Sequence, residues 1–315
     1  MILDEAFLRK LERLSLVARH VRTGQVVGER RSTKRGTSVE FADYRDYSRG
    51  DDLRRVDWNI YARLERPFVK LFEEEEDLAV HLLLDGSGSM DWGEDGEEET
   101  GGQGNKGRNK WVYARRLTAA LGYVALGGGD RLKVALLQGA EALPPTVART
   151  SSGLLSFGPC RGRGYALRLF QWLAGLEAEG TTDLNADLRA YAISAGRPGL
   201  AVLISDLFSP AGYVEGLTAL AARGHEVAVI HVLAPDEVEP PLGGDLRLLD
   251  VETGDPQEVT IDGGMRNLYR RRLAAWRDEI QAACHARDTR YVPVETDTPF
   301  DRVVLYDLRR AGLVK

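Results

Sequence analysis

Four short, continuous apolar runs, separated by stretches of helical periodicity, restrict the fold of this 315-residue chain more than any other feature. The runs are 79–84, 132–137, 200–205 and 227–233, and the helical stretches are 110–126, 163–176, 184–195 and 213–223. Strands that are apolar on both faces are typical of parallel sheets that helices cover on both sides. The sequence therefore predicts an α/β fold with a mostly parallel central sheet.

The rest of the chain contains weaker signals. A face that runs from Phe7 to Val21 predicts an N-terminal amphipathic helix packed against the main body, and Leu53 to Leu64 predicts a second, short helix before a strand at 68–72. Towards the C-terminus we expect a hairpin over 246–251 and 258–261, a long helix through Tyr269 and Cys284, a strand at 291–294 and a short helix after Pro299. We expect two parts: an N-terminal segment, 1–76, that packs on a main domain, 77–315. The main domain contains a mobile, acidic, Gly-rich loop at 92–109.

Composition excludes several classes of protein. With 43% hydrophobic and 29% charged residues, the chain is typical of a globular protein. No apolar run is long enough to span a bilayer, and the two cysteines, Cys160 and Cys284, are isolated, so we expect a cytoplasmic protein without a disulfide scaffold. The net charge is −6, and twelve acidic against three basic residues lie between Glu73 and Lys110. The chain has no excess of basic residues, so its charge does not favour binding to nucleic acids.

The sequence LLLDGSGSM, residues 82–90, carries the most informative chemistry. An apolar strand ends at Asp85, and Ser87 and Ser89 follow at alternate positions, with glycines between them that permit a tight turn. Three short oxygen-bearing side chains with this spacing can converge on one hard cation, and Mg²⁺ prefers such oxygen ligands. Mn²⁺ and Ca²⁺ are the alternatives.

Two further segments bring oxygen atoms to the ends of predicted strands. Thr182 and Asp183 lie just before a helix, and Asp206 ends another apolar run. Because the carboxyl ends of parallel strands meet at one edge of a sheet, where ligands of α/β proteins bind, Asp85 and Asp206 are expected at the same edge.

The order of these residues resembles the metal-ion-dependent adhesion site of von Willebrand factor A domains. It consists of Asp85, Ser87 and Ser89 in a DxSxS pattern, followed by Thr182 and then by Asp206. Residues 41–90, which include DYRDYSRGDDLRRVDWNIYAR, resemble the signature of the bacterial domain of unknown function 58 family. The resemblance implies a Rossmann-like von Willebrand A fold and a MoxR-type AAA ATPase as partner.

The same resemblance implies a role for each site residue. Ser87 and Ser89 would hold the metal directly, Thr182 directly or through water, and Asp85 and Asp206 through water or hydrogen bonds. The sixth position would take an acidic side chain of a partner protein. Met90, Asp183 and Leu207, which adjoin these residues in the sequence, are the candidate partner contacts.

Three alternatives remain open. The serines and aspartates could simply cap a turn and the next helix, or the metal site could be vestigial in a structural protein. A metal-dependent phosphohydrolase or phosphotransferase could use Asp85 as its nucleophile, although the acid that such an enzyme needs two residues later is Ser87 here. We favour a non-enzymatic, metal-dependent interaction module that works as an adaptor in the assembly or remodelling of protein complexes.

Overall fold

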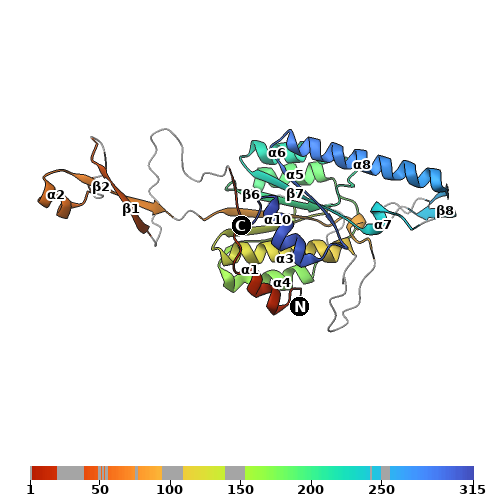
Figure 1. Ribbon diagram of the computed structural model, residues 1–315, viewed down its shortest axis with the longest axis horizontal. Coiled ribbons are helices and arrows are strands. Elements are labelled where there is room, and N and C mark those ends of the chain that lie inside the picture. The colour runs from red at the N-terminus through yellow and green to blue at the C-terminus, as the bar shows by residue number, and fades with distance from the viewer. Residues whose placement is uncertain are drawn as a thin grey trace. The chain divides into compact units, whose positions relative to one another are not determined.

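The computed structural model describes residues 2–19, 39–48, 51, 53, 56–74, 77–93, 109–138, 153–241, 243–249 and 256–315. Its internal contacts divide the chain into two compact units, residues 1–21 with 78–315, and residues 22–77 (Figure 1). The first 21 residues thus group with the main unit, whereas the sequence grouped them with the segment to residue 76. No helix within the described ranges is both long and apolar enough to cross a membrane.

A mixed sheet of six strands forms the centre of the main unit within the described residues, in the order β10-β7-β6-β3-β4-β5. Every neighbouring pair is parallel except β4 and β5, which are antiparallel. The predicted α/β fold with a mostly parallel sheet is confirmed. The strands are β3 (Ala79–Asp85), β4 (Arg131–Leu137), β5 (Leu155–Arg161), β6 (Leu200–Ser205), β7 (Glu226–Leu233) and β10 (Arg290–Glu295).

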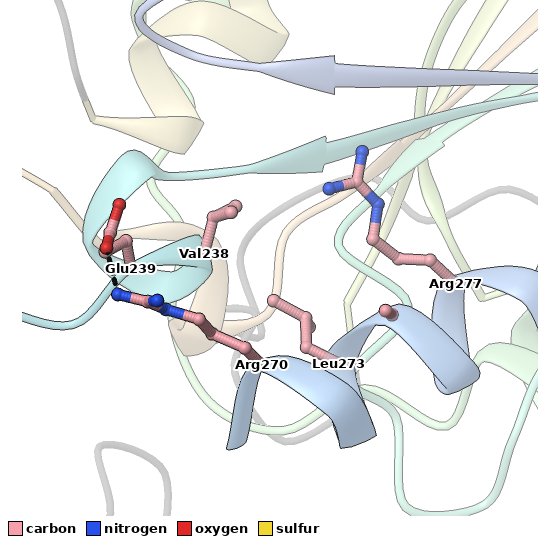
Figure 2. A pocket seen from close by; sticks show the side chains of 6 residues that line it. Val238, Glu239, Arg270, Leu273 and Arg277 are labelled. Carbon is pink, nitrogen blue, oxygen red and sulfur yellow. Dashed lines mark hydrogen bonds and ion pairs between the residues drawn. The ribbon is translucent and has the colours of Figure 1, made fainter. Parts of the chain in front are cut away.

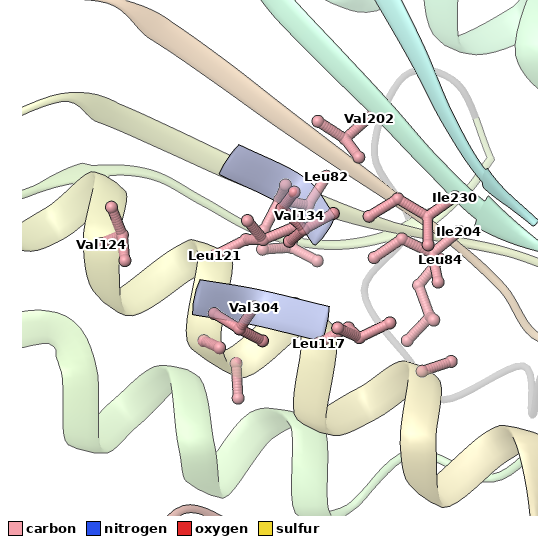
Figure 3. Packing of buried hydrophobic residues seen from close by; sticks show 14 of the residues in the cluster. Leu82, Leu84, Leu117, Leu121, Val124, Val134, Val202, Ile204, Ile230 and Val304 are labelled. Atoms are coloured by element: carbon pink, nitrogen blue, oxygen red, sulfur yellow. The ribbon is translucent and has the colours of Figure 1, made fainter. Parts of the chain in front are cut away.

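Helices cover both faces of this sheet. One face packs against α1 (Glu5–Leu11), α3 (Lys110–Gly127), α4 (Ala166–Ala174) and the C-terminal helical turns, and the other against α5 (Leu184–Ser194), α6 (Val214–Ala222) and α8 (Gly263–His285). Side chains of a strand alternate between faces, so Leu82 and Leu84 join the first core and Leu83 the second. Figure 3 shows the first core, where the sheet meets α3.

The predicted N-terminal helix is too long. Asp4 caps α1, since its Oδ1 accepts a hydrogen bond from the Phe7 amide at 2.6 Å, but the helix ends at Leu11. Leu16 instead forms an antiparallel bridge with Val314, and Arg290 donates to the carbonyl oxygen of Val17 at 3.0 Å. Pairing with the C-terminal segment therefore replaces the last turns of the expected helix.

The second unit contains a two-stranded antiparallel sheet, β1 (Val39–Asp46) with β2 (Phe68–Glu74), and the helix α2 (Trp58–Leu64). The helix begins later than predicted, because Asp57 caps it: its Oδ1 accepts from the amides of Asn59 and Ile60. The predicted strand at 68–72 is confirmed as β2, whereas β1 has no counterpart in the sequence analysis.

The C-terminal third follows the prediction closely. After β7 come α7 (Pro235–Val238) and the hairpin of β8 (Gly244–Leu249) with β9 (Pro256–Ile261), and then α8 and β10. The short helix expected after Pro299 is a series of turns, α9 (Phe300–Arg302), a π-helical turn (Val303–Asp307) and α10 (Leu308–Arg310). They pack into the first core through Val303, Val304 and Leu308.

Candidate metal centre

The two predicted carboxylates meet at the carboxyl edge of the sheet. Strands β3 and β6 are parallel neighbours with Leu84 opposite Ile204, so that Asp85 and Ser205 end adjacent strands. The Ser205 hydroxyl donates to Asp85 Oδ2 at 2.5 Å, and Asp206 follows directly. Asp85 and Asp206 are 2% and 1% exposed.

The loop after β3 brings the two serine hydroxyls together. The Ser87 amide donates to Asp85 Oδ1 at 3.0 Å, and the hydroxyls of Ser87 and Ser89 are hydrogen-bonded to each other with their oxygens 3.0 Å apart. A side chain at Gly86 would place its Cβ 2.8 Å from the Leu136 side chain, so glycine lets the loop pass this close to β4. Ser87 is buried and Ser89 partly exposed, as expected for a site that opens to solvent on one side.

The segment before α5 lies against this loop. The Gly88 amide donates to the Gly180 carbonyl oxygen at 2.8 Å, and the Glu179 amide to the Gly86 carbonyl oxygen at 2.9 Å. These bonds bring the buried Thr182 to the same edge, where its hydroxyl donates to the Leu137 carbonyl oxygen over 3.4 Å. That bond is long, so the hydroxyl is held only weakly by the protein.

The three candidate partner contacts have different surroundings. Asp183 is exposed and caps α5, because its Oδ1 accepts from the Ala186 amide at 2.9 Å. Met90 and Leu207 are 0% and 3% exposed and belong to the two apolar cores. Their side chains therefore pack inside the protein and are not available to a partner, which corrects the expectation for these two residues.

Lys110, the first residue of α3, is one of the site residues that the sequence analysis missed, together with Ser205, His231 and Glu237. Its ammonium group is fully buried and donates to Asp206 Oδ2 at 2.7 Å and to Glu237 Oε1 at 2.5 Å. It also lies 5.1 Å from the centre of the Phe208 ring. From sequence alone, a lysine at the start of a helix is expected to be exposed to solvent. Asp206 and Glu237 lie 96 and 127 residues away in sequence, so no local pattern predicts their ion pairs with Lys110.

Burial governs the ionisation of the acidic groups. Loss of solvation, with the nearby Asp206 charge as the second cause, raises the pKa of Asp85 to about 7, although hydrogen bonds from Ser205 and Ser87 oppose the shift. Burial also raises the pKa of Glu237, against the attraction of Lys110. Ionised carboxylates in this buried site therefore carry a desolvation penalty, which a bound cation would offset.

His231, which lies on β7, contacts the carboxyl edge of the sheet. Its Nε2 lies 3.0 Å from the Asp206 carbonyl oxygen and its Nδ1 lies 2.7 Å from the Tyr291 hydroxyl. Burial lowers the pKa of this imidazole to about 4, so it is neutral at physiological pH. It fixes the backbone of Asp206 and adds no charge to the centre.

Two oxygen atoms at this edge have the spacing that two ligands of a Mg²⁺ ion would need. Neighbouring ligands of an octahedral Mg²⁺ with bonds of about 2.1 Å lie about 3.0 Å apart, which is the spacing of the Ser87 and Ser89 hydroxyl oxygens. Among the described residues no group of three or more His, Cys, Asp or Glu could hold a metal. The donor set would thus consist of hydroxyls supported by two carboxylates, with water completing the coordination. Of the predicted acidic loop, residues 94–108 lie outside the described residues.

A separate cavity of about 320 Å³ lies between the end of α7 and α8, and Figure 2 shows Val238, Glu239, Arg270 and Arg277 along it. Arg270 pairs with Glu239, and Arg277 donates to Glu295 at 3.0 Å. Because both guanidinium groups are paired with carboxylates, the cavity has no excess charge with which to select an ionic ligand.

Comparisons with known proteins give one family. The model described as "Protein of unknown function DUF58" matches residues 43–279. The uncharacterized protein Rv1480 of Mycobacterium tuberculosis strain H37Rv is 30% identical over 98% of this chain and 92% of its own length, and the uncharacterized protein Mb1516 of Mycobacterium bovis matches to the same extent.

Two solved structures are similar at low identity. The conserved hypothetical protein BatB from Bacteroides thetaiotaomicron has a TM-score of 0.40 and 15% identity, over 75% of this chain and 98% of that one. An aerotolerance-related membrane protein from Bacteroides fragilis has a TM-score of 0.40 and 16% identity, over 74% of this chain and 99% of that one.

Proposed function

The chain belongs to the DUF58 family, whose function is unknown, and we propose that it is a non-enzymatic interaction module that uses a divalent cation to bind an acidic side chain of a partner protein. The observation that carries this proposal is the 3.0 Å spacing of the Ser87 and Ser89 hydroxyl oxygens beside two buried carboxylates. Hydroxyls and water leave most of the cation's charge unneutralised, so the ion retains a strong affinity for one more anionic oxygen.

The proposed assignment of the centre follows from its hydrogen bonds. Each oxygen of Asp85 and of Asp206 already accepts a hydrogen bond from the protein, which favours a supporting role for both residues. The Ser87, Ser89 and Thr182 hydroxyls would provide the direct ligands. Mg²⁺ is the ion we propose, with Mn²⁺ and Ca²⁺ as the alternatives to be tested.

We further propose that a MoxR-type AAA ATPase is the partner and that the protein acts as an adaptor in complex assembly in the cytoplasm. This part rests on the sequence resemblance of DxSxS, Thr182 and Asp206 to a metal-ion-dependent adhesion site and of residues 41–90 to the family signature. The isolated cysteines fit a reducing compartment.

Isothermal titration of the full chain with Mg²⁺ and Mn²⁺ tests the metal centre. We expect one site, and we expect Ser87→Ala to weaken binding at least tenfold because it removes a direct ligand. Ser194→Ala is the matched control, since Ser194 lies at the far end of α5, where its hydroxyl donates to the Tyr191 carbonyl oxygen. Equal affinity in the Ser87 variant and the control would refute this metal centre.

Co-purification tests the partner. The full chain should retain the ATPase in Mg²⁺ and lose it in EDTA, and the Ser87→Ala variant should fail to retain it in either buffer. Retention that is insensitive to both changes would show that the interaction does not pass through the metal centre.

A further inference from the structure

Lys110 is not a proposed metal ligand, but it forms an ion pair with one residue of the proposed metal centre, Asp206, and with Glu237 outside it. A fully buried ammonium group is costly unless anionic partners surround it, and here two carboxylates, those of Asp206 and Glu237, accept its hydrogen bonds. The face of the Phe208 ring, 5.1 Å away, adds an attractive contact with a cation. The buried ammonium group of Lys110 therefore lies between two carboxylates, one of which belongs to the candidate metal centre.

Lys110 also determines what Asp206 can do. One oxygen of Asp206 accepts from Lys110 at 2.7 Å, and the other accepts from the Phe208 amide at 3.1 Å. The His231 imidazole fixes the backbone of the same residue from behind. These two hydrogen bonds orient the Asp206 carboxylate, and each oxygen retains a lone pair that could accept a hydrogen bond from a metal-bound water.

Glu237 is the second carboxylate that binds the Lys110 ammonium group. Its Oε1 accepts from Lys110 at 2.5 Å, and its Oε2 accepts from the Ala234 amide at 2.8 Å, which holds the carboxylate in place at the start of α7. Glu237 therefore compensates the lysine charge, so that Asp206 is not the only anion paired with it. The three residues come from three different elements of the fold.

We propose that Lys110 is the resident counter-cation of the metal centre and that it keeps the affinity for a divalent ion low by holding Asp206 and by repelling the ion. The inference rests on the metal centre of the proposed function and adds its regulation. A weakly held ion exchanges readily and is stabilised further when a partner carboxylate binds, so the lysine would make metal binding depend on the partner.

The variant pair that tests this is Lys110→Met with Glu237→Gln, compared with Glu237→Gln alone. Removing both charges leaves Asp206 as an anion that only the added metal can neutralise, whereas the single variant leaves the lysine charge less compensated. We expect the double variant to bind Mg²⁺ at least about tenfold more tightly than the single variant, by calorimetry at pH 8. A lysine with a merely structural role would give weaker or unchanged binding.

A second double variant, Lys110→Gln with Glu237→Gln, keeps a hydrogen-bond donor for Asp206 without the charge, and it serves if methionine prevents folding. The unfolding midpoint in EDTA and in Mg²⁺ gives an independent readout: the ion should raise it more in either double variant than in Glu237→Gln. Glu237→Gln alone should bind Mg²⁺ several-fold more weakly than the unmodified chain.

The outcomes separate the two proposals. If the unmodified chain binds Mg²⁺ but the double variants bind no more tightly than Glu237→Gln, the role of Lys110 is refuted and the metal centre stands. If only the double variants bind, the role of Lys110 is supported, and metal binding by the unmodified chain without a partner is refuted. If no protein in the series binds Mg²⁺ or Mn²⁺, both proposals are refuted.

Discussion

Ionisation of Asp85 should destabilise the metal-free protein, and Asp85→Asn should remove that destabilisation. The asparagine keeps both contacts of the carboxylate. Its Oδ1 can accept from the Ser87 amide, and its Nδ2 can donate to the Ser205 hydroxyl oxygen. In the unmodified chain this oxygen accepts from the Leu207 amide, and it has a second lone pair for the asparagine. The variant thus changes the charge and leaves the shape of the site intact.

The sign and size follow from the pKa of Asp85, which is raised from 3.8 to about 7, chiefly by burial. Because the folded pKa lies above the unfolded one, the stabilisation is fully present below pH 4 and is lost as the pH rises to 7. Each pKa unit corresponds to about 1.4 kcal/mol, so the loss has an upper limit of about 4 kcal/mol. Above pH 7 the unmodified chain should be less stable than Asp85→Asn by up to this amount.

Urea unfolding of both proteins in EDTA, from pH 4 to pH 8, measures the effect as the difference between their free energies of unfolding. Buried imidazoles such as His81 and His231, with pKa values lowered to about 3 and about 4, change stability in the opposite direction, but both proteins share them and their contribution cancels. Mg²⁺ at pH 8 should stabilise the unmodified chain alone. A difference that stays constant across this pH range would refute the reasoning.

Three further predictions concern packing, the core and catalysis. Gly199→Ala should destabilise the fold by about 3 kcal/mol or more, because the new Cβ would lie 1.9 Å from the Ala79 carbonyl oxygen, whereas Gly164→Ala meets nothing within 4 Å and should change the free energy of unfolding by less than about 0.5 kcal/mol. Arg290→Met should cost about 3 to 5 kcal/mol in the same urea assay, since it removes the buried ion pair with Glu226 and the hydrogen bonds from Arg290 to the Val17 and Gly312 carbonyl oxygens; a loss below about 1 kcal/mol would contradict this. With Mg²⁺ the full chain should not hydrolyse p-nitrophenyl phosphate, because both oxygens of the carboxylate that ends β3 are already hydrogen-bonded; turnover that Asp85→Asn abolishes would instead favour a phosphohydrolase.

Strands β3, β4, β6 and β7 were predictable because they are buried on both faces along most of their length, which leaves a continuous apolar run in the sequence. Strand β5 has no such run: it contains Gly158 and Pro159, it pairs with β4 alone among the strands that the structure describes, and its side chains are partly or fully exposed. An edge strand of this kind is specified by its neighbour, so its own sequence carries little signal. The same reason explains the N-terminal helix, which ends early because Leu16 pairs with Val314.

The site residues also differ in how far the sequence predicts them. Asp85, Ser87 and Ser89 follow one strand, so their spacing alone predicts that their oxygens converge, and the parallel topology adds Asp206. Lys110 could not be predicted, because its burial depends on β6 and on α7, which tertiary packing alone brings to the start of α3.

The second unit, residues 22–77, is inserted in the sequence between two parts of the main unit. Before it, Ser15 exchanges backbone hydrogen bonds with Lys315, and after it the chain enters β3 in the interior of the sheet. Folding of the main unit therefore closes these residues into a loop, and the entropy cost of closing a loop grows only slowly with its length. The main unit can consequently carry a longer or a shorter insertion with little change in its own free energy of unfolding.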